Sequence, residues 1–228
     1  MHYKEITMPH IPSFITLPFT LERDAPPFEA NAVKYPESLV RYFLKAYTKR
    51  GQKVFDPFTG LGTTLFVAEE TGRIPFGLEY DERRYEWVAG QLEHWNNMAC
   101  GDALKLSRIA AARRWPKLDF CMTSPPFMPK TDQWNPLSAG NPAKAGYDTY
   151  LRQMKQAFTQ VSDLMKRSAR IVVHVDDIPG RVFTPLARDI SITLEKIPSL
   201  TLEADITIAW KNARKDYPCA HCLVFKKK

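Results

Sequence analysis

Hydrophobic and polar positions along the chain fall into two alternating patterns. Short continuous apolar runs are typical of strands buried on both faces, and apolar residues spaced three and four apart are typical of helices packed on a sheet. The runs predict strands at residues 53–55, 74–78, 98–100, 118–122, 169–175, 200–210 and 219–225. The helical spacing predicts helices at residues 36–49, 63–71, 81–95, 104–114, 148–167 and 184–196.

The order of these elements predicts the architecture. Strands and helices alternate along most of the chain, which is typical of a parallel sheet covered by helices. Two strands close together at the end indicate an antiparallel edge. We therefore expect an α/β, Rossmann-like fold with a mostly parallel seven-stranded sheet and an antiparallel edge strand.

Domain organisation is predicted to be simple. We find no internal repeat and expect one domain over residues 1–228. Residues 1–31 are rich in proline and aromatic residues without a clear period, and we interpret them as an arm laid over the domain. Residues 128–147 contain several prolines and glycines and form a connection too long for a plain turn, which indicates a functional loop.

Composition narrows the class of partner. Lys and Arg number 32 against 25 Asp and Glu, a net charge of +7. This balance favours a polyanion such as DNA, although charge alone fits an ordinary basic surface equally well. The four cysteines do not indicate a disulfide scaffold, and no apolar run approaches the length of a membrane span. We expect a cytoplasmic protein with no membrane association.

A glycine-containing turn follows the first predicted strand. Asp56 ends that strand, and Gly60 and Gly62 allow a tight bend that lets a ligand approach the backbone. Thr63 and Thr64 are expected to cap the next helix. The pattern lacks the spacing of dinucleotide-binding and phosphate-binding loops. It predicts a site for a nucleoside-type cofactor, with a purely structural turn as the weaker alternative.

Two further acids follow the next two predicted strands. Glu79 lies at the end of one, where an acid commonly accepts hydrogen bonds from ribose hydroxyls. Asp102 follows the other and can reach the exocyclic amine of an adenine ring. Ligands of doubly wound sheets bind at the carboxyl ends of the strands. Acids at three successive ends therefore support a cofactor site.

A proline-stiffened string follows the fourth predicted strand. Ser124 offers a hydroxyl acceptor, and the Pro125 carbonyl offers a second, whose direction is fixed because Pro126 restricts the backbone. Phe127 offers a ring face on which a base can stack. Such a clamp suits the amino group of a nucleobase, whose lone pair is delocalised and which needs acceptors for its N–H groups. The alternative is a proline-rich turn with a packed phenylalanine.

Both strings resemble motifs of the amino-directed DNA methyltransferases, the N4-cytosine and N6-adenine group. Residues 56–64 are similar to the family's Asp-Pro-Phe-x-Gly-x-Gly-Thr cofactor motif, and residues 123–127 to its Ser-Pro-Pro-Phe/Tyr catalytic motif. Residues 28–43 resemble the segment that closes the cofactor pocket, and residues 210–212 and 221–227 resemble the closing strands. The resemblance covers roughly residues 28–228.

This resemblance implies an S-adenosylmethionine-dependent methyltransferase fold, S-adenosylmethionine as cofactor and a target base flipped out of DNA. The implied cofactor-binding residues are Asp56, Pro57, Phe58, Gly60, Gly62, Thr63, Thr64, Glu79 and Asp102. The implied catalytic residues are Ser124, Pro125, Pro126 and Phe127. No metal is implied.

Two departures from the family pattern affect the expectations. The cofactor motif precedes the catalytic motif, whereas many Ser-Pro-Pro members have the opposite order. No long segment remains for a separate target-recognition domain, so residues 128–147, with Lys130 and Trp134, and the arm at residues 1–31 are the candidates for DNA contact. Sequence recognition is expected to be short, relaxed or supplied by a homodimer or partner subunit.

The choice of target atom rests on Ser124. Ser-Pro-Pro in place of Asp-Pro-Pro favours cytosine N4, with adenine N6 as the alternative. An RNA amino methyltransferase or a non-catalytic cofactor-binding subunit associated with DNA is less favoured. Cys219 and Cys222 lack a second ligand pair for zinc. His174 is interpreted as a core histidine rather than a base.

Overall fold

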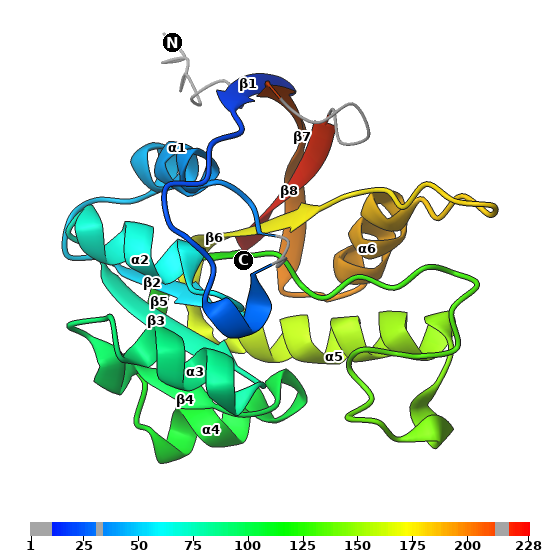
Figure 1. Ribbon diagram of the computed structural model, residues 1–228, viewed down its shortest axis with the longest axis horizontal. Coiled ribbons are helices and arrows are strands. Elements are labelled where there is room, and N and C mark those ends of the chain that lie inside the picture. The colour runs from blue at the N-terminus through cyan, green and yellow to red at the C-terminus, as the bar shows by residue number, and fades with distance from the viewer. Residues whose placement is uncertain (1–10, 31–33, 213–218) are drawn as a thin grey trace, which may run out of the picture.

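The computed structural model describes residues 11–30, 34–212 and 219–228 of the chain. These residues form one eight-stranded sheet with the order β1-β7-β8-β6-β5-β2-β3-β4 (Figure 1). The strands are β1 Phe14–Pro18, β2 Lys53–Asp56, β3 Ile74–Glu79, β4 Met98–Cys100, β5 Leu118–Thr123, β6 Met165–Val175, β7 Leu200–Lys211 and β8 Cys219–Lys227.

The sheet is mostly parallel, as predicted, and β8 is its antiparallel strand. Two details of the prediction are wrong. β8 lies between β6 and β7 rather than at an edge, and the sheet has an eighth strand. The additional strand is β1, which comes from the predicted arm and pairs in parallel with β7 from Phe14↔Thr207 to Pro18↔Lys211. This five-residue strand is short, and its side chains are exposed or only partly buried, so its position depends on backbone pairing with β7 that the sequence pattern does not reveal.

Helices follow the predicted order with shifted ends. The α-helices are α1 Glu37–Tyr47, α2 Thr63–Glu70, α3 Glu82–Ala89, α4 Leu106–Ala112, α5 Tyr147–Leu164 and α6 Leu186–Glu195. Short 3-10 turns are η1 Pro27–Glu29, η2 Trp95–Asn97, η3 Ala103–Lys105 and η4 Pro142–Lys144.

Three helix predictions need correction. α3 ends at Ala89, before Gly90, instead of continuing to residue 95. α5 ends at Leu164 because residues 165–167, predicted as helical, already belong to β6. Gly146 occupies the N-cap position of α5 with φ of 85°, so Asp148 lies inside the first turn and does not cap the helix.

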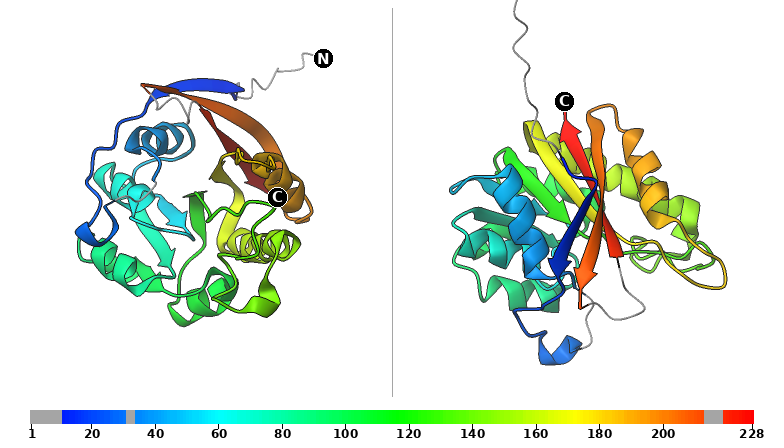
Figure 2. Two further views of the ribbon diagram at one scale, coloured as in Figure 1. Left: turned by 45° about the vertical axis from the view of Figure 1, so that its right-hand side comes forward. Right: turned by 90° about the horizontal axis from the view of Figure 1, so that it is seen from above.

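Helices cover both faces of the sheet (Figure 2). Side chains of the central strands alternate between two hydrophobic clusters, one on each face. Val54 packs in the layer that includes α1 and the end of α2, and Phe55 packs in the opposite layer with α5 and α6. β5 repeats the alternation with Phe120 and Cys121. A strand buried on both faces requires this continuous apolar sequence, which is why these strands were predictable. None of the described helices is long and apolar enough to cross a membrane.

Candidate active site

The carboxyl ends of β2 and β5 lie side by side because these strands are neighbours, with Phe55 paired to Cys121. Each strand delivers one of the two strings singled out in the sequence. Thr123 Oγ1 donates a hydrogen bond of 2.6 Å to Asp56 Oδ1, across 67 residues of sequence. The structure therefore joins the start of the glycine turn directly to the start of the Ser-Pro-Pro-Phe string.

Asp56 is the buried centre of this junction, with 1% of its surface exposed. Its Oδ1 also accepts a hydrogen bond from the Phe58 backbone N–H at 3.0 Å, and its Oδ2 accepts one from the Tyr35 hydroxyl at 3.4 Å. Burial raises the pKa of Asp56 to about 6, although the hydrogen bonds from Thr123 and Phe58 oppose that shift. The carboxyl group can therefore change charge near neutral pH.

Tyr35 was not singled out as a site residue, although it lies in a segment that resembles a pocket-closing one. Its hydroxyl also bonds Thr64 Oγ1, and this threonine reaches the Met122 carbonyl at 3.4 Å. The expectation that Thr63 and Thr64 cap α2 is wrong, because Gly62 is the N-cap residue and no side chain caps that end. Thr64 instead ties α2 to Tyr35 and β5.

The glycine turn depends on its two glycines for different reasons. Gly62 has φ of +81°, and an added Cβ would lie 2.7 Å from Val88 and 2.8 Å from Phe66. Gly60 has φ of +54°, an added Cβ would meet only the Phe58 carbonyl oxygen at 3.9 Å, and its N–H donates a 2.6 Å hydrogen bond to Glu79 Oε2. Gly62 is therefore required by packing and conformation, and Gly60 by conformation alone.

Glu79 is the last residue of β3, which is beside β2, and Asp102 follows β4, which is beside β3. Glu79 is 6% exposed, accepts from the Asp81 N–H at 3.0 Å as well as from Gly60, and has a pKa raised by burial. Asp102 Oδ1 accepts from the Leu104 N–H at 2.8 Å. Three acids thus stand at three successive strand ends on one side of the sheet.

The Ser-Pro-Pro-Phe string leaves β5 beside this turn. Ser124 is half-buried, Pro125 is buried and the Phe127 ring is 62% exposed. Tyr150, a fully buried residue of α5, donates a 2.9 Å hydrogen bond from its hydroxyl to the Pro126 carbonyl. That bond anchors the backbone of the string while leaving the phenylalanine ring in solvent.

His174 is a site neighbour that the sequence interpretation missed. It is buried on β6, as expected for a core histidine, but its Nδ1 lies 3.2 Å from Ser124 Oγ. The contact follows from strand pairing, because Thr123 is paired with Val173 and the next residues of both strands are Ser124 and His174. Only the knowledge that β5 and β6 are adjacent in this register would have revealed it.

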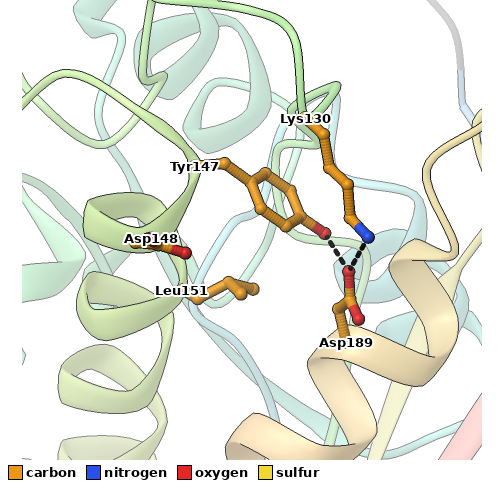
Figure 3. Close-up of a pocket in the computed structure, with 5 residues that line it drawn as sticks. All are labelled: Lys130, Tyr147, Asp148, Leu151 and Asp189. Atoms are coloured by element: carbon orange, nitrogen blue, oxygen red, sulfur yellow. Dashed lines mark hydrogen bonds and ion pairs between the residues drawn. The ribbon is translucent and has the colours of Figure 1, made fainter. Parts of the chain in front are cut away.

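An open cavity of about 510 Å³ adjoins the loop that follows this string (Figure 3). Asp189 Oδ2 accepts a hydrogen bond from the Tyr147 hydroxyl at 2.9 Å and pairs with Lys130 Nζ at 3.2 Å. Asp148 and Leu151 complete the lining. These contacts hold both ends of the predicted 128–147 loop against α6. The charges of Lys130 and Asp189 neutralise each other.

Large apolar side chains protrude from two loops at this edge. Phe127 and Trp134 belong to the connection after β5, and Val182 and Phe183 to the connection after β6. All four are between 51% and 64% exposed. The second connection is closed at its base by two 3.0 Å backbone hydrogen bonds between Ile178 and Thr184.

Metal ligands do not gather in the described part of the chain. No group of three or more His, Cys, Asp or Glu side chains there could hold a metal ion. Cys219 is exposed, whereas Cys222 is buried.

Sequence comparisons match part of this chain to known methyltransferases. Residues 22–90 match the sequence model of a family described as DNA methylase, N6_N4_Mtase. Type II methyltransferase M.ScaI of Streptomyces caespitosus is 31% identical over 64 residues, which are 28% of this chain and 21% of that protein. Type II methyltransferase M.BglII of Bacillus subtilis is 31% identical over 71 residues, which are 29% of this chain and 20% of that protein.

The predicted resemblance to amino-directed DNA methyltransferases is thereby confirmed. The chain spans about a fifth of the length of the curated relatives it matches. The family match includes residues 56–64 and Glu79, and the string from Ser124 to Phe127 lies beyond it.

Solved structures show the fold. An rRNA methylase from Streptococcus thermophilus has a TM-score of 0.53 at 11% identity, covering 86% of this chain and 98% of that one. A TehB-like methyltransferase from Corynebacterium glutamicum has 0.53 at 18%, covering 88% and 92%. Magnesium protoporphyrin IX methyltransferase from Synechocystis PCC 6803, with bound S-adenosylmethionine, has 0.53 at 14%, covering 84% and 77%. The predicted fold of S-adenosylmethionine-dependent methyltransferases is therefore confirmed.

Proposed function

We propose that this protein is an S-adenosylmethionine-dependent DNA methyltransferase that modifies the exocyclic amino group of a flipped base, most readily N4 of cytosine. The observation that carries the proposal is the 2.6 Å hydrogen bond between Thr123 and Asp56. It joins the glycine turn to the Ser-Pro-Pro-Phe string at one edge of the sheet, which supports a cofactor and a target base bound within reach of each other.

The cofactor half of the proposal assigns roles to the acids and the glycine turn. When bound, S-adenosylmethionine supplies an electrophilic methyl group on a positively charged sulfur. Asp56, Phe58 and Gly60 would line its methionine end, Glu79 would bind the ribose and Asp102 the adenine. Pro57, Thr63, Thr64 and Gly62 would shape the turn. The buried carboxylates fit this role, because Asp56 suits a cationic ligand and Glu79, which accepts two backbone N–H donors, has further lone pairs for ribose hydroxyls.

The catalytic half assigns the target base to the string after β5. Ser124 Oγ and the Pro125 carbonyl would accept the two N–H groups of the base, which orients the nitrogen and draws electron density onto it. Phe127, exposed beside them, would stack on the ring. Pro126 would hold the geometry, with Tyr150 fixing its carbonyl.

Proton release from the methylated amine needs no strong base. The amino nitrogen becomes acidic once it carries the additional methyl group, so water or Ser124 can accept the proton. Serine at this position favours cytosine N4 over adenine N6, since the family's adenine enzymes more often carry Asp-Pro-Pro-Tyr.

DNA contact is assigned to the loops that flank the clamp. The exposed rings of Trp134 and Phe183 lie on connections from the strand that carries Ser124 and the strand beside it. Exposed aromatic side chains can stack on bases or enter a disturbed base step, and the net charge of +7 favours a phosphate backbone. Sequence recognition would come from these loops, with a second copy or a partner subunit as the alternative source.

The decisive experiment is mass spectrometry of nucleosides from duplex DNA incubated with the protein and methyl-labelled S-adenosylmethionine. We expect labelled N4-methylcytosine, and far less label with the Ser124→Ala protein at equal concentration. Labelled N6-methyladenine would move the target to the alternative base. Label in RNA but not in DNA would replace DNA as substrate. Cofactor binding without any methylation would contradict the enzyme and favour a cofactor-binding subunit.

A further inference from the structure

We propose that His174 is a positioning residue for the serine clamp. Its Nδ1 accepts a hydrogen bond from the Ser124 hydroxyl, so that the serine oxygen presents only lone pairs to the target amino group. The inference deepens the proposed function and rests on it for the identity of the amino group. It names a residue of β6 that lies outside both motifs.

Strand pairing fixes the geometry of this contact. β5 and β6 are parallel neighbours whose last pair is Thr123 with Val173. Ser124 and His174 are the next residues along the two chains and therefore lie side by side. The distance from His174 Nδ1 to Ser124 Oγ is 3.2 Å, and the histidine is 5% exposed. A buried imidazole on a central strand cannot move away from the serine without disturbing the core.

Hydroxyl chemistry explains why such a partner is useful. A serine hydroxyl has one proton to donate and two lone pairs to offer. The amino group of cytosine or adenine offers N–H donors, because its own lone pair is delocalised into the ring. Ser124 serves this group only as an acceptor. A neighbour that accepts a hydrogen bond from the serine hydroxyl therefore turns the oxygen lone pairs toward the base and raises their electron density.

The surroundings of the imidazole support a neutral ring with the proton on Nε2. Nε2 has no hydrogen-bond partner among the described residues, so Ser124 is what orients the ring through Nδ1. The rings of Tyr35 and Trp210 lie with centroids 5.3 Å and 6.5 Å from that of His174. Aromatic π systems accept an N–H but repel a lone pair. Burial also lowers the pKa of His174, which keeps the Nδ1 lone pair available.

The same arrangement connects the clamp with the cofactor turn. Tyr35 packs beside His174 and sends its hydroxyl to Asp56 and Thr64. His174 therefore lies between Ser124 and a residue that touches the turn. Its substitution by a smaller group would loosen the tyrosine as well, so the test must separate packing from hydrogen bonding.

Two matched substitutions make this separation. His174→Asn keeps an acceptor oxygen near the position of Nδ1, whereas His174→Leu keeps apolar bulk and removes the acceptor. With methyl transfer to duplex DNA as the assay, we expect Leu to lower kcat about 10- to 100-fold, in the range found when a residue that orients a functional side chain is lost. Asn should retain most of the rate, and the KM for DNA and the Kd for S-adenosylmethionine should change little in both.

A double-mutant cycle adds a readout that a merely structural role would not move. In the Ser124→Ala background the hydroxyl proton is gone, so His174→Leu should produce no further loss of kcat. Independent, additive losses would overturn the proposal. So would an Asn protein as slow as the Leu protein when both melt within a few degrees of the parent.

Nitrogen NMR of histidine-labelled protein tests the hydrogen bond without any turnover. The chain contains five histidines, and the His174 signal is identified by its absence from His174→Asn. We expect the Nε2–H tautomer with an Nδ1 shifted by hydrogen bonding, and loss of that shift in Ser124→Ala. A proton on Nδ1 would overturn the proposal. A protein with the expected spectrum that methylates no DNA would contradict the proposed function and not this hydrogen bond.

Discussion

The glycine turn, proposed to bind the cofactor, and the loops around the Ser-Pro-Pro-Phe string occupy the same edge of the sheet but are built in opposite ways. In the turn, Asp56 and Glu79 are almost fully buried and their oxygens accept hydrogen bonds from the protein. In the loops, the rings of Phe127, Trp134 and Phe183 are more than half exposed. The polar groups of the turn find their hydrogen-bond partners within the chain, whereas the aromatic rings of the loops are exposed to solvent.

This difference matches the two kinds of ligand in the proposal. A small cofactor is the same at every turnover, so donors and acceptors fixed in advance lower the entropy cost of binding it. A nucleic acid is large and brings its own bases and phosphates, so exposed rings and basic groups become useful only when it arrives. Substitutions in the turn should therefore affect folding and cofactor affinity, and substitutions in the loops should affect DNA alone.

The largest expected effect lies where the two regions meet. Ser124→Ala should lower kcat for DNA methylation about 100- to 1,000-fold, because it removes an acceptor aimed at the reacting nitrogen. S-adenosylmethionine affinity, measured by calorimetry, should stay within about threefold of the parent. A comparable loss of cofactor affinity would show that the serine belongs to the cofactor region and not to the clamp.

The next largest effect is expected in a comparison of two glycines that have similar φ angles. Gly62→Ala should lower the free energy of unfolding by about 2–4 kcal/mol, combining left-handed strain with overlap against Val88 and Phe66. Gly140 has φ of +76° with nothing near its missing Cβ, so Gly140→Ala should cost only about 1 kcal/mol. Urea unfolding measures both values. Equal losses would mean that the turn is no more tightly packed than the loop.

Acid should weaken cofactor binding through Asp56. Its pKa of about 6 means that the carboxyl group gains a proton as the pH falls below that value and then no longer attracts a cationic ligand. The Kd for S-adenosylmethionine should therefore rise by up to about tenfold per pH unit below pH 6 and be flat above it. Asp56→Asn should bind weakly with a reduced pH dependence. An unchanged slope in that protein would assign the titration to another group.

The smallest effect is expected in the loop after β6. Phe183→Ser should weaken duplex DNA binding several-fold, in line with the loss of one partly stacked ring, while leaving the melting temperature and cofactor affinity unchanged. Ile192→Ser, on the partly exposed surface of α6, is the matched control and should leave DNA affinity as it was. Fluorescence anisotropy at fixed salt measures both proteins. Equal behaviour would remove Phe183 from the DNA surface.

The sequence predicts most of the fold because buried strands and amphipathic helices leave strong periodic signals. It does not predict β1, whose side chains are only partly buried and whose position depends on backbone pairing with β7. It also misplaces the start of β6, because residues 165–168 are mostly polar and continue the α5 pattern. The antiparallel strand was assigned to an edge because sequence order does not reveal spatial order.

The candidate site divides in the same way. Asp56, Glu79 and Ser124 were predictable, since each follows an apolar run at a strand end. The partners that orient them were not. Tyr35 precedes a helix and reaches the turn from another layer, and His174 contacts Ser124 through the register of two parallel strands. Such contacts depend on tertiary neighbours, which periodicity does not encode.

The short strand at the start of the described chain also has a practical consequence. Phe14–Pro18 covers the outer hydrogen-bonding groups of β7, so a protein shortened to begin at residue 19 would expose a long, unprotected strand. Such a truncation would be prone to intermolecular pairing and precipitation, even though every residue of the proposed catalytic site would still be present.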